Sequence, residues 1–161
     1  MTKMTPGNGA SFLLLFFPML YSLTNSAPTN QVATYWTRGE MGYLYIDKLV
    51  NQSEALAECL RIYKGRLLTI LNVAQDDAIS DMIVDLGISH DIITSGKINY
   101  VSHPFPEWEW STTATLFPYR NWSPSSPDFE NHCCFKGVQA SNFYRWRSLD
   151  CDTVGVFICE M

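Results

Sequence analysis

Apolar residues along this chain follow first a strand spacing and then a helical spacing. Residues 41–47 alternate aromatic and aliphatic side chains and predict a first β-strand. The spacing then becomes helical, with apolar residues at Ala55, Leu56, Cys59, Ile62 and Tyr63. Cys59 is therefore predicted to lie on the buried face of a helix.

Polar residues mark the two ends of this helix. Asn51, followed three residues later by Glu54, matches a capping box with Asn in place of the usual Ser or Thr. Gly65 stands where the C′ residue of the helix is expected. Residues 67–70 are apolar apart from one threonine and predict a short buried strand.

A second helix is predicted from Asn72, which repeats the capping pattern with Gln75, to a stop at Gly87. Its inward-facing stripe consists of Ala78, Met82 and Leu86. Further short strands are expected at 92–94 and 108–110, then a Pro-rich loop over 122–131 and three more short strands. This order of elements predicts an α+β domain.

The N-terminal residues have the pattern of a secretory signal. Lys3 precedes an apolar stretch over residues 12–23, and small residues follow, with cleavage expected after Ser26. The alternative is a membrane anchor, but the apolar run is about a dozen residues where a span needs roughly 20. We expect residues 1–26 to be a signal peptide, 27–40 a poorly ordered polar lead, and 41–161 one folded domain.

Charge and cysteine content narrow the class of protein further. Loss of Lys3 with the signal would change the net charge from −5 to −6, so we expect no nucleic-acid partner and no anionic membrane surface. All 5 cysteines follow residue 26, which in a secreted, extracellular domain predicts disulfides with one thiol left over.

Several ordered motifs carry a family resemblance over residues 42–161. They are the cysteine of the first helix, Trp108-Glu109-Trp110, Tyr119-Arg120-Asn121-Trp122, Ser126-Pro127-Asp128 and the closing Phe157-Ile158-Cys159-Glu160. Together they resemble the C-type lectin-like domain, in its single-domain invertebrate form. The resemblance implies two helices flanking small antiparallel sheets, with a long loop region whose Pro-rich part faces the ligand. One departure is 94–97, where the family's Trp-Ile-Gly-Leu motif is absent.

The resemblance also implies a calcium site that this sequence has largely lost. Calcium takes oxygen ligands, and the corresponding positions here are Ser126, Asp128, Glu130, Arg147 and Ser148. The guanidinium of Arg147 has donors and no acceptor, so it cannot ligate a cation. We expect it to pair with Asp128 or Glu130 instead, and we expect no calcium cofactor. Residues 92–106 also lack any carboxylate for an accessory site.

Family resemblance implies a disulfide between Cys59 and Cys159. Neighbouring residues on a strand face opposite sides, so only one of Cys133 and Cys134 can reach Cys151. The run at 130–133 resembles the family's approach to this cysteine and favours Cys133, but the alternative stays open. The leftover thiol would then be free or would link two chains, which for Cys134 means a disulfide-linked dimer.

Other candidate chemistry is sparse. We expect His90, His103 and His132 to be surface residues, because no spacing matches a structural zinc site. Sequons begin at Asn51 and Asn121; the first is the expected glycosylation site, although a glycan there conflicts with a helix-capping role. Trp108, Trp110, Trp122 and Trp146 are expected in the core, and Pro127 is expected to follow a cis bond, as in the family.

The resulting hypothesis is a secreted, calcium-independent binding protein, not an enzyme. Its nominal ligand is a carbohydrate, held by hydrogen bonds from Asp128, Glu130, Arg147 and the loop over 121–131. The alternative is a protein-binding module that has lost sugar recognition and uses the same face for an extracellular protein ligand.

Overall fold

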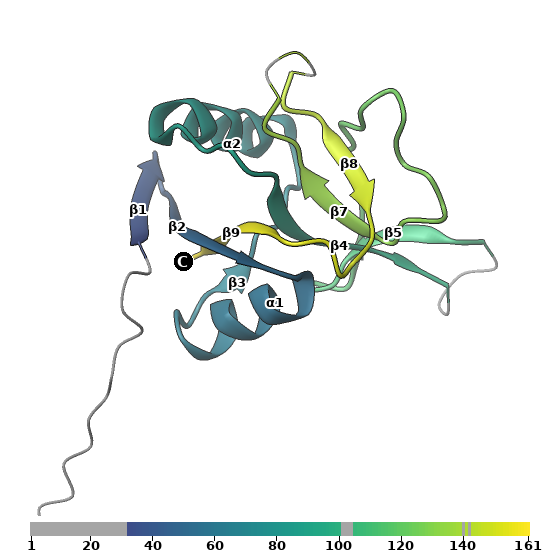
Figure 1. The fold of residues 1–161 in the computed structure, drawn as a ribbon, viewed down its shortest axis with the longest axis horizontal. Helices are drawn as coiled ribbons and strands as arrows, with labels where there is room; N and C mark the ends of the chain where they lie inside the picture. The colour runs from purple at the N-terminus through teal and green to yellow at the C-terminus, as the bar shows by residue number, and fades with distance from the viewer. Residues whose placement is uncertain (1–31, 101–104, 140, 142) are drawn as a thin grey trace, which may run out of the picture.

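The computed structural model describes residues 32–100, 105–139, 141 and 143–161, so the predicted signal peptide lies outside the described residues. The helices and strands are β1 Val32–Arg38, β2 Met41–Val50, α1 Gln52–Arg61, β3 Arg66–Leu67, α2 Val73–Leu86, β4 Ile92–Asn99, β5 Glu107–Trp110, β6 Thr115–Leu116, β7 Cys133–Lys136, β8 Trp146–Leu149 and β9 Gly155–Glu160. The predicted α+β class is confirmed (Figure 1). Among these described elements, no helix is long and apolar enough to cross a membrane.

One mixed sheet runs through the domain in the order β1-β2-β9-β4-β5-β6, with β3 paired to β9 and β7 paired to both β4 and β8. Of these pairings, β4 with β9 is parallel and the others are antiparallel. Figure 1 shows α2 above and α1 below the central strands. The helices therefore cover opposite faces of the sheet.

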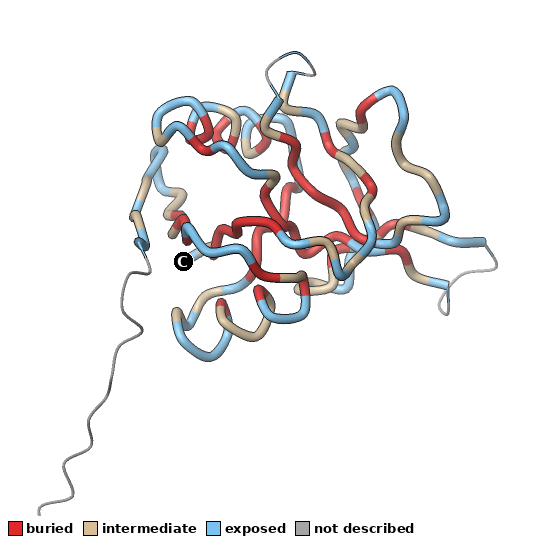
Figure 2. Tube along the Cα trace, in the orientation of Figure 1, coloured by how far each residue is buried: buried red, intermediate tan, exposed pale blue. Residues whose placement is uncertain are grey.

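The core is accordingly divided into two clusters. Ile79 and Met82 of α2 belong to one cluster, and Ala55 and Cys59 of α1 belong to the other. Successive residues of a strand alternate between the two, because their side chains point to opposite faces. Figure 2 shows the buried residues concentrated along the central strands.

The prediction of a poorly ordered lead over residues 27–40 is wrong for residues 32–38. Residues 32–38 form strand β1, which pairs along its whole length with β2, from Val32 opposite Asp47 to Arg38 opposite Met41. A turn at Gly39, where φ is 61°, allows the chain to reverse between them. The backbone hydrogen bonds of this hairpin order a segment whose side chains are largely exposed.

Helix α1 begins as predicted and ends differently. Asn51 and Glu54 form a complete capping box. The helix stops at Arg61, and the left-handed residue is Lys64 rather than Gly65. Gly65 is required for another reason, since a Cβ there would lie 2.4 Å from the Glu160 carbonyl oxygen. Ile62, expected on the buried face, is 59% exposed because the helix has already ended.

The strand that precedes helix α2 is also shorter than predicted. Only Arg66 and Leu67 form strand β3, although the next residues to Ile70 are buried. They are held by a side chain, because the Glu160 carboxylate accepts a 2.8 Å hydrogen bond from the Thr69 N–H. Helix α2 then begins at the Asn72 cap and ends at Gly87 in the left-handed conformation, as predicted.

The structure contains two disulfide bonds, Cys59–Cys159 and Cys133–Cys151. The first joins residues 100 positions apart, and for a loop of that length the chain-entropy model gives about 4–5 kcal/mol of stabilisation. Strand alternation separates the adjacent cysteines, with Cys133 in the cluster under α1 beside Cys151, and Cys134 in the cluster under α2.

Cys134 has no exposed surface, so the alternative of a dimer linked through this residue is not compatible with the fold. Burial also raises the pKa of the Cys134 thiol far above its ordinary value, which keeps it unreactive. We predict that iodoacetamide labels this thiol only after denaturation, as measured by mass spectrometry. A disulfide-linked dimer on a non-reducing gel of the native protein would contradict this.

Candidate binding site

The Pro-rich loop begins where the chain crosses the end of strand β8. Trp146 N–H donates to the Asn121 carbonyl at 2.7 Å, and Ser123 N–H donates to the Trp146 carbonyl at 2.8 Å. These bonds fix Trp122 beside Trp146. Farther along the loop, the bond between Ser126 and Pro127 is cis, as predicted.

Two serine side chains, of Ser126 and Ser148, hold the middle of this loop against β8. Ser148 donates to the Ser126 hydroxyl through its backbone N–H at 3.2 Å and through its own hydroxyl at 3.4 Å. The Ser148 hydroxyl in turn accepts from the Asp128 N–H at 2.9 Å. Ser148 is buried, so its role is to position the loop.

Asp128 organises the second half of the loop. Its Oδ1 accepts hydrogen bonds from the N–H of Glu130 at 3.2 Å and of Asn131 at 2.8 Å, and from Asn131 Nδ2 at 2.9 Å. The side-chain bond from Asn131 is the largest cause that lowers the pKa of Asp128, since it stabilises the ionised form. Asp128 Oδ2 accepts a further hydrogen bond from Asn131 Nδ2 at 3.0 Å. That oxygen retains capacity for a ligand.

The predicted pairing of Arg147 with Asp128 or Glu130 is wrong. Arg147 instead forms an ion pair with Asp91, which directly precedes β4. The reason is strand alternation, because Ser148 faces the loop and its neighbour Arg147 must point to the other side. The five predicted ligand-binding positions are thus divided, with Ser126, Asp128 and Ser148 brought together, Glu130 exposed on the same loop, and Arg147 directed elsewhere.

Beneath the loop lies a buried carboxylate that the sequence analysis missed. Asp76 of α2 accepts hydrogen bonds from Lys136 Nζ and Trp146 Nε1 on Oδ1, both at 2.8 Å, and from Asn121 Nδ2 on Oδ2 at 2.6 Å. Tyr119 approaches Oδ2 at 3.4 Å. Asp76 therefore ties α2 to β7, to β8 and to the start of the loop.

Several tryptophans pack together around Trp146, whose indole N–H donates to this carboxylate. Trp108, Trp110 and Trp146 are buried, as predicted, and Trp122 is half-buried. Trp146 meets the rings of Trp110 and Trp122 edge-on, with ring centroids 5.6 and 5.7 Å apart. These contacts make the base of the loop a packed aromatic layer.

A small exposed aromatic group lies at the far end of the loop, and it was also missed. Phe129 is 58% exposed and Tyr100 is 51% exposed. The Tyr100 hydroxyl donates to the Phe129 carbonyl at 3.2 Å, and its ring meets His132 edge-on at 5.4 Å. Phe129 directly follows Asp128, so an apolar ring and carboxylates occupy the same exposed turn. The only sequence signal was the position of Phe129 between two acids in a turn-rich segment.

Comparison with known proteins places this geometry in a family. The profile of the Lectin C-type domain matches residues 48–161. The chain belongs to this family. Lithostathine of Rattus norvegicus is 24% identical over 119 residues, which cover 73% of this chain and 70% of that protein. Regenerating islet-derived protein 4 of Homo sapiens is 29% identical over 119 residues, covering 73% and 72%.

Solved structures show the same C-type lectin fold. A complex of SPL-1 with GlcNAc has a TM-score of 0.68 at 22% identity, covering 79% of this chain and 91% of that one. The Ca²⁺-independent C-type lectin SPL-2 from Saxidomus purpuratus has a TM-score of 0.67 at 22% identity, covering 79% and 90%. A calcium-independent type II antifreeze protein has a TM-score of 0.63 at 20% identity, covering 82% and 95%.

In this lectin-family domain the side chains of both sequon asparagines, Asn51 and Asn121, form hydrogen bonds with other residues. Asn51 Oδ1 accepts from the Glu54 N–H at 3.0 Å and from the Ser53 hydroxyl at 2.9 Å, which is the capping role that conflicts with a glycan. Asn121 donates its side-chain N–H to Asp76. Cys133 is bonded to Cys151, so it is not available as a metal ligand beside His132.

Removal of the Asp76 charge tests the buried cluster of this lectin domain. Asp76→Asn should lower the free energy of unfolding by about 3–5 kcal/mol, because Lys136 would be left as a buried cation without a counter-charge. The neighbouring Asp77→Asn, on the exposed side of α2, is the control and should change it by less than about 0.5 kcal/mol. Urea unfolding followed by tryptophan fluorescence measures both.

A second substitution separates charge from packing in this test. Adding Lys136→Met to Asp76→Asn should recover part of the lost stability, because the uncompensated cation is removed while the Asn oxygen can still accept from Trp146. Equal stability of Asp76→Asn and Asp77→Asn would contradict the assigned role of the ion pair.

Proposed function

We propose that this protein is a secreted lectin that binds a carbohydrate at the loop face formed by residues 123–131 and strand β8, without a calcium bridge. The observation that carries the proposal is the set of hydrogen bonds among Ser126, Asp128 and Ser148. These bonds hold the loop at the positions where the family resemblance implies metal ligands. The loop is therefore held in place by hydrogen bonds within the protein.

The donor set at this face does not fit calcium. Calcium needs six to eight oxygens, and here Arg147 offers none and is paired with Asp91. The Asp128 Oδ1 atom already accepts three N–H groups. SPL-2, a Ca²⁺-independent C-type lectin, has the same fold.

The groups available to a sugar are those that the fold leaves exposed on the loop. The Phe129 ring can pack against the apolar face of a pyranose, and the Glu130 carboxylate and Asp128 Oδ2 can accept hydrogen bonds from hydroxyls. Ser148 acts indirectly by holding Asp128. Arg147, predicted as a sugar ligand, is not part of this proposed set because it faces Asp91.

Two further observations support the proposal that the protein is secreted. The signal-like pattern of residues 1–26 and two disulfide bonds both favour an oxidising extracellular compartment. Lectins of this kind act by binding, and we propose no catalytic role.

A protein ligand is the second candidate, and exposed phenylalanines favour it. Phe143 is 76% exposed and lines, with Pro124 and Arg145, a shallow hollow of about 200 Å³ beside the loop. Together with Phe129 it gives the loop region two large apolar side chains in solvent. Exposed aromatic residues of this type are enriched in protein interfaces.

Calcium titration tests the metal-independent part of the proposal. Isothermal calorimetry of the wild-type protein should show no calcium binding at physiological concentration, and chelator should leave the thermal midpoint unchanged. The variant Ser148→Asp adds a carboxylate on the face that holds Ser126 and Asp128, so it should bind calcium more tightly than the wild type. Tight binding by the wild-type protein would overturn the proposal.

A glycan array, run once with calcium and once with chelator, tests the binding activity. We expect a glycan signal that survives chelation and that falls roughly two- to tenfold in Phe129→Ala, the effect of losing one ring contact. Tyr35→Ala is the matched control, because Tyr35 is a similarly exposed aromatic residue on β1.

Two outcomes would redirect the proposal. A signal lost on chelation would contradict calcium independence. Absence of any glycan signal, together with capture of a defined extracellular protein that Phe129→Ala or Phe143→Ala weakens, would favour the protein-binding module.

A further inference from the structure

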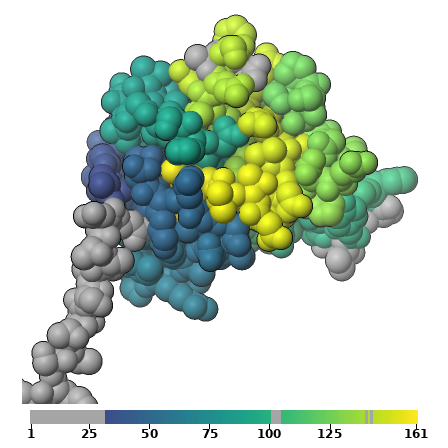
Figure 3. All heavy atoms as spheres, in the orientation of Figure 1, coloured from purple at the N-terminus to yellow at the C-terminus, as the bar shows by residue number. Residues whose placement is uncertain are grey.

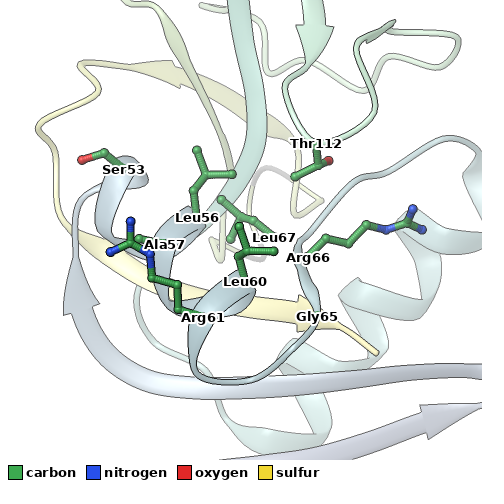
Figure 4. A pocket seen from close by; sticks show the side chains of 9 residues that line it. All are labelled: Ser53, Leu56, Ala57, Leu60, Arg61, Gly65, Arg66, Leu67 and Thr112. Carbon is green, nitrogen blue, oxygen red and sulfur yellow. The ribbon is translucent and has the colours of Figure 1, made fainter.

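A second concave site lies on the α1 side of the domain. Helix α1, strand β3 and the turn after β5 enclose a pocket of about 430 Å³, within the range typical of small-molecule sites. Its walls are Leu56, Ala57 and Leu60 of α1, with Leu67 and Thr112 opposite. Figure 4 shows the three leucine side chains directed into the space between the helix and Thr112.

The interior presents mostly apolar atoms because its polar groups are already bonded. The Thr112 hydroxyl forms hydrogen bonds of 2.7 Å with Thr69 and 3.0 Å with Ser95. In Figure 4 its oxygen points away from the leucines. The hydroxyl of Ser53 donates to the Asn51 cap. A ligand inside this pocket would therefore gain from apolar burial and would displace no hydrogen bond of the protein.

The walls are held in place before any ligand arrives. The Cys59–Cys159 disulfide fixes α1 to β9, and β3 pairs with the same strand through Leu67 opposite Cys159. The absence of a side chain at Gly65 lets the connecting turn approach the Glu160 backbone. This rigidity reduces the ordering cost of binding. Leu60 is 68% exposed at the rim of the pocket, where a large apolar side chain in contact with water contributes nothing to folding stability.

The two arginines at the rim of the pocket indicate which head group a ligand would carry. Figure 4 shows Arg61 beside Ala57 at one end of the pocket and Arg66 extending away at the other. Arg66 is paired with Glu160. The Arg61 guanidinium has no hydrogen bond or ion pair to any residue that the structure describes. A guanidinium that no described residue pairs with, next to an apolar pocket on a chain of net charge −5, is a local site for an anionic head group.

We propose that this pocket binds a small amphipathic anion, with its apolar chain among the leucines and its head group on Arg61. A medium-chain fatty acid is the simplest molecule of this class. The site is separate from the Pro-rich loop, so a ligand here could be carried whether or not the loop face is occupied.

Titration of the mature protein with three ligands of equal chain length tests the proposal. Octanoate, octanol and octyltrimethylammonium differ in head-group charge, and each is added below its micelle-forming concentration. Amide shifts in ¹⁵N-NMR spectra should saturate with octanoate at residues 53–67 and Thr112, octanol should bind more weakly, and the cation weakest. Equal binding of all three, or no saturable shift in this region, would overturn the proposal.

Two variants with a matched control locate the site. Arg61→Gln should weaken octanoate binding by at least about tenfold and leave octanol binding unchanged, since it removes one charge-assisted contact. Leu60→Gln should weaken both ligands. Ile62→Gln is the control, because Ile62 is a similarly exposed residue, 59%, that does not line the pocket. Octanoate affinity that is unchanged in Arg61→Gln, with native circular dichroism retained, would refute the assigned head-group site.

Discussion

The architecture depends on a single buried carboxylate, that of Asp76. A charge removed from water must be compensated, and here Lys136, which is fully buried, and two neutral N–H donors supply the compensation. The donors come from β7, from β8 and from the segment before the Pro-rich loop. Each of those pieces must therefore arrive at one point under α2 for the charge to be satisfied. The loop face is built on the far side of that point, with Trp146 shared between the two.

A second constraint is the alternation of side chains along strands, which decides details that matter for function. It places Cys133 under α1, where it bonds Cys151, and encloses Cys134 under α2. It likewise turns Ser148 toward the loop and Arg147 toward Asp91. Ser148, one departure from the family motif, thus supports the loop, whereas its neighbour Arg147 forms an ion pair on the other face of the sheet. Adjacent positions in sequence need not share a site.

Local patterns were sufficient to predict the caps at Asn51 and Asn72, the two helices and the α+β class, because these features depend on near neighbours. The family motifs added the cysteine pairs and the cis bond. Long-range contacts were not predictable. Asp76 resembles any acid in the first turn of a helix, and its partner Lys136 is 60 residues away. Strand β1 was missed because its ordering comes from pairing with β2, although its alternating Val32, Thr34 and Trp36 gave a signal.

The pairing of β1 and β9 on either side of β2 has a consequence for how the domain can be presented. Met161 donates its N–H to the Gly42 carbonyl of β2, β1 pairs with the same strand, and Figure 1 shows β1 and the C-terminus on the same side of the domain. Figures 1 and 3 show the segments around residues 105–130 at the opposite side. A tether attached at either terminus would therefore display the loop outward. Several copies anchored in this way on one surface could engage a multivalent ligand together, and weak individual contacts would then add up to strong attachment.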